Sequence, residues 1–172
     1  KYCYRPDIYH DMSVKEAFKV SAVWVYIELA KRIGKEKYRE YLASCNYGNA
    51  DITVDDIDFW NFGSLAISPV NEIEILKGVY EETLPFKKQN FSIIKSIMLE
   101  EQTDHYQLRA KTGRTSHDGK DIGWWVGWVE RKDDVYFFAT RLLKNSNTVN
   151  PDFGSCRKTI TRSILKEMGI ID

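Results

Sequence analysis

Residues 122–130 read Ile-Gly-Trp-Trp-Val-Gly-Trp-Val-Glu, and this stretch decides the class of fold. It is rich in the aromatic and β-branched residues that favour strands, and its apolar side chains fall on both faces. A strand of this kind is usually central in a sheet that is covered on both sides. The charged turn at 131–134 and the apolar run at 135–143 predict that it pairs as a hairpin.

The rest of the chain predicts helices around this hairpin. One further strand is expected at 106–111, and helical spacing or capping residues predict helices over about 13–34, 35–44, 69–82, 89–101 and 155–168. No linker divides the chain, so residues 1–172 are expected to form one α+β domain with a central antiparallel sheet and helices on both faces. Three strands make a narrow sheet for two covered faces. We therefore expect a second chain, as in a homodimer, or a further segment to complete the sheet.

Composition excludes several classes of protein. The 172 residues carry 25 Lys and Arg and 25 Asp and Glu, so the net charge is zero, which argues against a nucleic-acid partner. Three scattered cysteines and three histidines show no metal-ligand spacing, so no metal site is expected. No apolar run reaches the roughly 18 residues that a membrane span requires.

Four short motifs could carry chemistry. They are Ser21-Ala22-Val23 on the first helix, Tyr47-Gly48-Asn49 in a turn, Phe59-Trp60, and Lys111-Thr112-Gly113 at the end of a strand. Each alone has an ordinary structural interpretation, such as a helix serine, a turn, a core aromatic or a strand end. The last motif joins a cation, a hydroxyl and an open backbone, a combination that suits an extended anionic substrate.

Taken in this order, the motifs resemble the class D (oxacillinase-type) serine β-lactamases. Residues 21–30 with Gly34 look like the motif helix of that family, residues 123–130 look like its central strand, and residues 137–139 and the helix of Arg157 follow as the family's do. The resemblance implies a serine β-lactamase or penicillin-binding-protein-like fold. It also implies hydrolysis of β-lactam antibiotics through a serine acyl-enzyme, in the periplasm or outside a bacterial cell.

One departure from the family is important. The family's nucleophile belongs to a Ser-x-x-Lys motif that precedes the Ser-x-Val helix, and residues 1–20 contain no such motif. The later matches at Ser92, Ser155 and Ser163 come in the wrong order and lie on amphipathic helices, where Ser and Lys three apart are common neighbours. The resemblance therefore implies an N-terminally truncated member, with a sheet that is incomplete at that end. We expect this chain alone to be inactive.

The resemblance assigns three catalytic roles within this chain. In the family, the lysine of the absent motif reacts with carbon dioxide or bicarbonate to form a carbamate, which acts as the general base. Trp60 matches the tryptophan whose indole N–H binds that carbamate. Ser21 would relay a proton to the β-lactam nitrogen, and Lys111 would support Ser21 and raise the local positive potential.

The resemblance also assigns binding roles for the β-lactam substrate. Val23 would line the apolar side of the lysine pocket, and Thr112 and Arg157 would bind the substrate carboxylate. Gly113 leaves the strand edge open, and the backbone N–H of Arg114 would supply half of the oxyanion hole. Arg157 is alternatively an ordinary surface residue of its helix.

Two other functions share this fold and these motifs. They are the β-lactam sensor domain of a membrane signalling receptor and the transpeptidase domain of a penicillin-binding protein. Val23 and Trp60 favour the enzyme, because sensors and transpeptidases more often carry Asn at the position of Val23, and because Trp60 is the residue expected to hold the carbamate.

Overall fold

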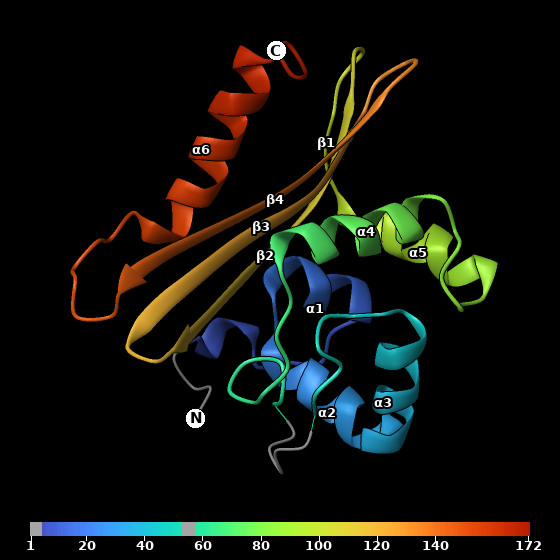
Figure 1. The fold of residues 1–172 in the computed structure, drawn as a ribbon, viewed down its shortest axis with the longest axis vertical. Coiled ribbons are helices and arrows are strands. Elements are labelled where there is room, and N and C mark those ends of the chain that lie inside the picture. Colours follow the sequence, from blue (N-terminus) through green and yellow to red (C-terminus); the bar gives the residue numbers. More distant parts are fainter. Residues whose placement is uncertain (1–4, 53–57) are drawn as a thin grey trace.

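A four-stranded antiparallel sheet is the centre of the computed structural model, which describes residues 5–52 and 58–172 (Figure 1). The strand order within these residues is β1-β2-β3-β4, and the strands are β1 Leu99–Gln102, β2 Gln107–His117, β3 Lys120–Glu130 and β4 Val135–Asn145. The predicted hairpin of 122–130 with 135–143 is confirmed. Both of its strands are longer than expected, and β3 is paired along its whole length on both sides.

The prediction of only three strands is wrong, because β1 lies where the sequence predicts the end of a helix. The helix α5 Lys88–Met98 stops at Leu99, which takes an extended conformation and pairs with Arg109 of β2. The hydroxyl of Thr103 accepts the N–H groups of His105 and Tyr106 and so closes the turn between β1 and β2. The strand therefore depends on a pairing across the turn, which helical periodicity does not encode.

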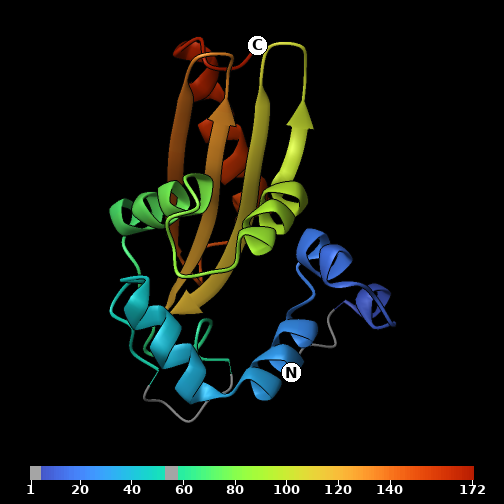
Figure 2. The same cartoon turned by 90° about the vertical axis from the view of Figure 1, so that its right-hand side faces the viewer.

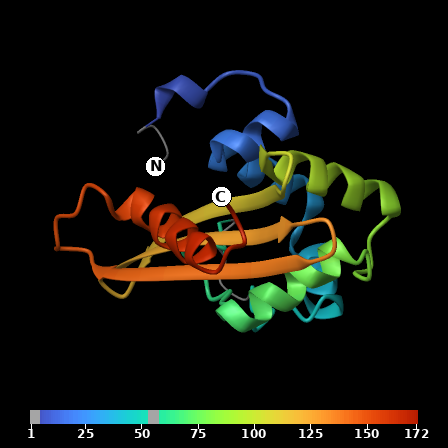
Figure 3. The same ribbon diagram turned by 90° about the horizontal axis from the view of Figure 1, so that it is seen from above.

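Helices cover both faces of the sheet, as predicted. The helix α6 Phe153–Glu167 lies on one face, and α4 Pro69–Tyr80 lies on the other (Figure 3). Trp125 and Trp128 are both fully buried, one beneath each layer. Trp128 packs with Leu76 of α4 and Met98 of α5, so α5 also contributes to the second layer.

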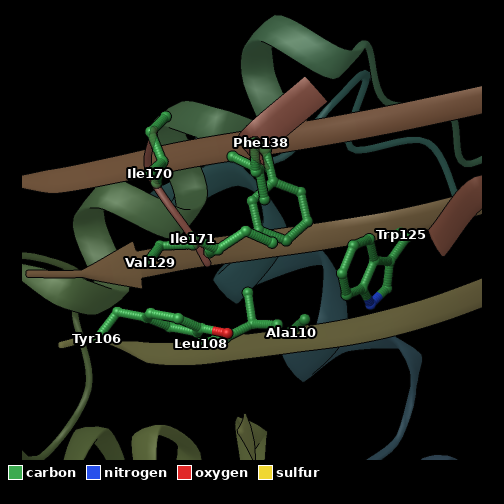
Figure 4. Close-up of a cluster of buried hydrophobic side chains, with 9 residues drawn as sticks. Tyr106, Leu108, Ala110, Trp125, Val129, Phe138, Ile170 and Ile171 are labelled. Atoms are coloured by element: carbon green, nitrogen blue, oxygen red, sulfur yellow. The ribbon is translucent and has the colours of Figure 1, made fainter. Parts of the chain in front are cut away.

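The larger core lies between the sheet and α6 (Figure 4). Trp125 and Val129 of β3 meet Leu165 of α6 there, together with Ile170 and Ile171 from the segment after that helix. The guanidinium of Arg131 donates hydrogen bonds to the carbonyls of Gly169 and Ile170. The C-terminal end of α6 is therefore fixed to the sheet by apolar contact and by hydrogen bonds.

A group of short helices lies at one end of the sheet (Figure 2). They are a 3-10 turn Pro6–Ile8, α1 Val14–Val20, α2 Val23–Ile33 and α3 Lys35–Ser44. Ser13 caps α1 by accepting the N–H of Glu16, as its spacing predicts. Among the described residues, no helix combines the length and the apolar character needed to cross a membrane.

The single helix predicted over 13–34 is wrong, because the chain breaks at Ser21. Ser21 takes a left-handed conformation with φ 55° and ends α1, while its N–H bonds back to that helix. The next N–H, from Ala22, bonds to the carbonyl of Ala17, and the side chains of Ala17 and Ala22 are fully buried. A left-handed conformation is uncommon for serine. The chain therefore changes direction at Ser21, which is also the serine of the Ser-x-Val motif.

Candidate active site

A cleft of about 810 Å³ lies between the short helices and the sheet. The break between α1 and α2, the loop around Trp60, the middle of β2 and the first half of α6 form its walls. The eight residues to which the resemblance assigns catalytic or binding roles all line this one cleft: Ser21, Val23, Trp60, Lys111, Thr112, Gly113, Arg114 and Arg157. The fold thus brings together residues that are spread over most of the chain.

Ser21 and Lys111 are in direct contact although 90 positions separate them. The Nζ of Lys111 lies 2.5 Å from the Oγ of Ser21 and also donates to the carbonyl of Thr112 at 3.0 Å. The backbone break places the hydroxyl of Ser21 opposite β2. A proton can therefore pass directly between the lysine and the serine.

The environment of Lys111 penalises its charged form. Burial, together with the nearby cations of Arg157 and Lys158, lowers the pKa of Lys111 to about 8, against a smaller opposing effect of Glu100. Phe18 provides a partial compensation, because its ring centroid lies 5.4 Å from the ammonium group. Lys111 can therefore exchange a proton near neutral pH, as a group in a proton relay must.

Arg157 reaches from α6 into the wall of the cleft. Its Nη1 donates to the carbonyl of Gly113 at 2.6 Å, and its buried Nε has no hydrogen-bond partner within the described residues. Burial and the charge of Arg114 both lower the pKa of Arg157. Arg157 is therefore not an ordinary surface residue of the helix.

Trp60 lines the cleft and packs against an aromatic cluster. Its ring meets Phe59 edge-on with centroids 5.0 Å apart, and Phe59 meets Tyr38 in the same way. The indole N–H of Trp60 has no hydrogen-bond partner in the described part of the chain. The cleft thus presents a free N–H donor beside apolar groups, which suits an anion held away from water.

Sequence reasoning missed several lining residues of the cleft wall. Tyr26, Tyr38 and Leu42 also line the cleft, beside Tyr47 of the turn motif. Tyr38 and Leu42 are four apart on α3, so the apolar side of that helix was a usable signal. Nothing in the sequence showed that this side would face a cleft instead of the core.

The Tyr47-Gly48-Asn49 turn shapes the wall. Gly48 has φ 56°, and its N–H donates to the side-chain carbonyl of Asn71 at 2.6 Å. Asn49 ties the two sides of the loop together by donating to the carbonyl of Ser64 and accepting the N–H of Ala66. The motif therefore holds the segment that follows Trp60.

The three later Ser-x-x-Lys matches lie away from the cleft. Ser92, Ser155 and Ser163 do not line the cleft. Lys158, the partner of Ser155 in the motif, is paired with Glu100 at 2.6 Å. In the described residues, no group of three or more His, Cys, Asp and Glu side chains could hold a metal ion.

Comparison with known proteins gives a consistent result. Residues 3–166 match the family described as the penicillin-binding protein transpeptidase domain. The chain is 41% identical over 163 residues to β-lactamase OXA-20 of Pseudomonas aeruginosa and 37% identical over 161 residues to β-lactamase OXA-48 of Klebsiella pneumoniae. Each match covers 94% of this chain, but only 58% and 59% of the relative. The chain thus spans a little over half the length of these curated relatives.

Solved structures agree with the sequence matches. A class D β-lactamase from Sebaldella termitidis superposes with a TM-score of 0.89 at 40% identity, over 94% of this chain and 65% of that chain. A class D β-lactamase from Nostoc superposes with a TM-score of 0.88 at 36% identity, over 94% of this chain and 67% of that chain. The chain therefore belongs to the penicillin-binding protein transpeptidase domain family and, within that family, to the class D β-lactamases.

Proposed function

We propose that this chain supplies most of the active site of an enzyme that hydrolyses β-lactam antibiotics through a serine acyl-enzyme. The single observation that carries the proposal is the 2.5 Å contact between Ser21 and Lys111 in a cleft that Trp60 and Arg157 also line. The nucleophile would come from a Ser-x-x-Lys segment outside these 172 residues. On this proposal residues 1–172 are part of one domain, and further strands would pair at the free edge of β4.

Arg157 and Thr112 would bind the carboxylate of the β-lactam. The N–H groups of Arg157 that Gly113 does not use, including the buried Nε, form a planar fork that matches a carboxylate. Substrate bound there would lie along β2, with its carbonyl near the backbone N–H of Arg114. That N–H and the N–H of the nucleophile would form the oxyanion hole, where one donor typically contributes about 100- to 1,000-fold in rate.

Ser21 and Lys111 would protonate the leaving nitrogen. When the nucleophile attacks the carbonyl, the C–N bond of the ring breaks and the nitrogen takes the proton of the Ser21 hydroxyl. Lys111 then returns a proton to Ser21 across their contact. A pKa of about 8 fits this role, because the lysine can both lose and regain a proton near neutral pH.

Trp60 and Val23 would support the general base. Carbon dioxide bound to the lysine of the missing motif would supply a carbamate that activates the nucleophile and the hydrolytic water. The free indole N–H of Trp60 would hold that anion, and Val23 would keep its surroundings apolar. These two residues support an enzyme over a β-lactam sensor or a transpeptidase. Because β-lactams act on the cell wall, we place the protein in the periplasm or outside the cell.

The test uses a chromogenic cephalosporin and the gene product that contains this chain. We expect steady turnover that bicarbonate stimulates, and no turnover by residues 1–172 alone. A single stoichiometric burst would overturn the enzyme and support the sensor, and no reaction at all would overturn both. Lys111→Met should lower kcat by about 100-fold or more, since it removes a proton donor. Lys120→Met, on the exposed hairpin tip, is the matched control and should not change kcat.

A further inference from the structure

The charge of the cleft exceeds what one substrate carboxylate requires. Its described lining residues include five basic side chains and no acidic one: Arg5, Lys19, Lys111, Arg114 and Arg157. Arg5 is paired with Asp7 at 2.8 Å, and Lys111 is bound to Ser21. If Arg157 binds the ring carboxylate of a β-lactam, Arg114 remains as a second guanidinium at the same site.

Arg114 lacks a carboxylate of its own. Its Nη2 lies 3.4 Å from the Oδ2 of Asp121, but the Nζ of Lys144 lies nearer that oxygen, at 2.7 Å. The other oxygen of Asp121 already accepts the hydroxyls of Ser116 and Ser146. One carboxylate is thus shared by two cations, so the group as a whole keeps one positive charge.

The guanidinium of Arg114 is accessible and lies near Arg157. Its side chain is 58% exposed, and its guanidinium carbon lies 5.9 Å from the ring centroid of Phe153. Phe153 precedes Arg157 by one turn of α6, so both cations lie along the same helix face. The lowering of the pKa of Arg157 by Arg114 agrees with this proximity. Two guanidinium groups thus repel each other until an anion lies near each of them.

We propose that Arg114 is a second anion-binding residue that makes the enzyme favour β-lactams with an additional carboxylate in the acyl side chain. The proposal rests on the proposed function, in which Arg157 holds the carboxylate of the ring. The fork of Arg114 can form a charge-assisted pair with the second carboxylate, while a neutral side chain leaves Arg114 with only its shared contact to Asp121. The backbone N–H of Arg114 is not involved, so the role is separable from the oxyanion hole.

The test compares two penicillins that differ by one carboxylate, benzylpenicillin and its α-carboxy derivative carbenicillin. The readout is the ratio of kcat/KM for carbenicillin to kcat/KM for benzylpenicillin, measured with the gene product that contains this chain. Arg114→Gln should lower this ratio by about tenfold, which is the effect of about 1.4 kcal/mol. Arg114→Lys should lower this ratio less than Arg114→Gln does, because lysine keeps the positive charge. Arg141→Gln is the matched control, since Arg141 is exposed on β4 and does not line the cleft.

A second measurement needs no variant. Raising the ionic strength from about 0.05 to about 0.5 M should lower the ratio in the unchanged protein, because the Debye length shortens to a few ångströms. A ratio that neither salt nor Arg114→Gln changes would overturn the role of Arg114 and leave the proposed function intact. Absence of turnover with both penicillins in the unchanged protein would overturn the proposed function, and this inference with it.

Discussion

Replacing Lys111 by methionine should stabilise the fold at neutral pH. The fold lowers the pKa of Lys111 from its ordinary 10.5 to about 8, so at pH 7 the lysine is charged in an environment that penalises its charge. A difference of this size corresponds to about 3 kcal/mol. Losing the hydrogen bond to Ser21 offsets about 1 kcal/mol. We therefore expect a gain in the free energy of unfolding of about 2 kcal/mol at pH 7.

The pH dependence of this gain identifies its cause. Below pH 8 the lysine is charged in both states and the full gain is present. Between pH 8 and 10.5 the folded protein loses the proton first, so the gain declines, and once both states are neutral only the loss of the hydrogen bond, about 1 kcal/mol, remains. Urea unfolding at pH 7, 9 and 10.5 measures this course, with Lys120→Met as the control for loss of an exposed lysine. A variant that is less stable than the parent at pH 7, by an amount independent of pH, would refute the reasoning.

Three further substitutions test the framework around the cleft by thermal or urea unfolding. Gly48→Ala should destabilise by about 3 kcal/mol or more, because its Cβ would lie 2.0 Å from the carbonyl oxygen of Ala66 at a positive φ, and equal stability would contradict that geometry. Leu108→Ala should destabilise by about 2 to 5 kcal/mol, since Leu108 is fully buried in the core beneath α6, and a loss well below 1 kcal/mol would show that the core collapses freely there. Asp121→Asn should destabilise at pH 7, because Lys144 holds the pKa of Asp121 below its usual range. The loss should shrink as the pH falls below about 4, and a loss that grows toward acid would reverse the assigned sign.

The sequence predicted the sheet and the helices that cover it better than it predicted where the helices end. Residues 122–130 had apolar groups on both faces, and β3 is covered on both faces. The break at Ser21 was missed because the apolar spacing of α1 continues into α2 and neither Gly nor Pro marks the turn. The contact of Ser21 with Lys111 joins residues 90 positions apart, which local sequence patterns do not encode.

The sequence indicated which residues belong to the candidate site, but it did not indicate how they are arranged. Motif order identified residues that all line one cleft. The sharing of Asp121 between Arg114 and Lys144 depends on the register of β3 with its two neighbours, which local patterns do not determine. The lowered pKa of Lys111 likewise depends on burial by other elements and on Arg157 of α6.

The anchoring of the end of α6 has a consequence for changes that fall just after this helix. Loss of the chain from Ile170 onward would remove two buried side chains of the core, Ile170 and Ile171, and a carbonyl that Arg131 binds. The same helix carries Arg157 at its other end. A truncation at this point should therefore loosen the C-terminal end of α6 from the sheet and, through the same helix, disturb the position of Arg157 in the cleft.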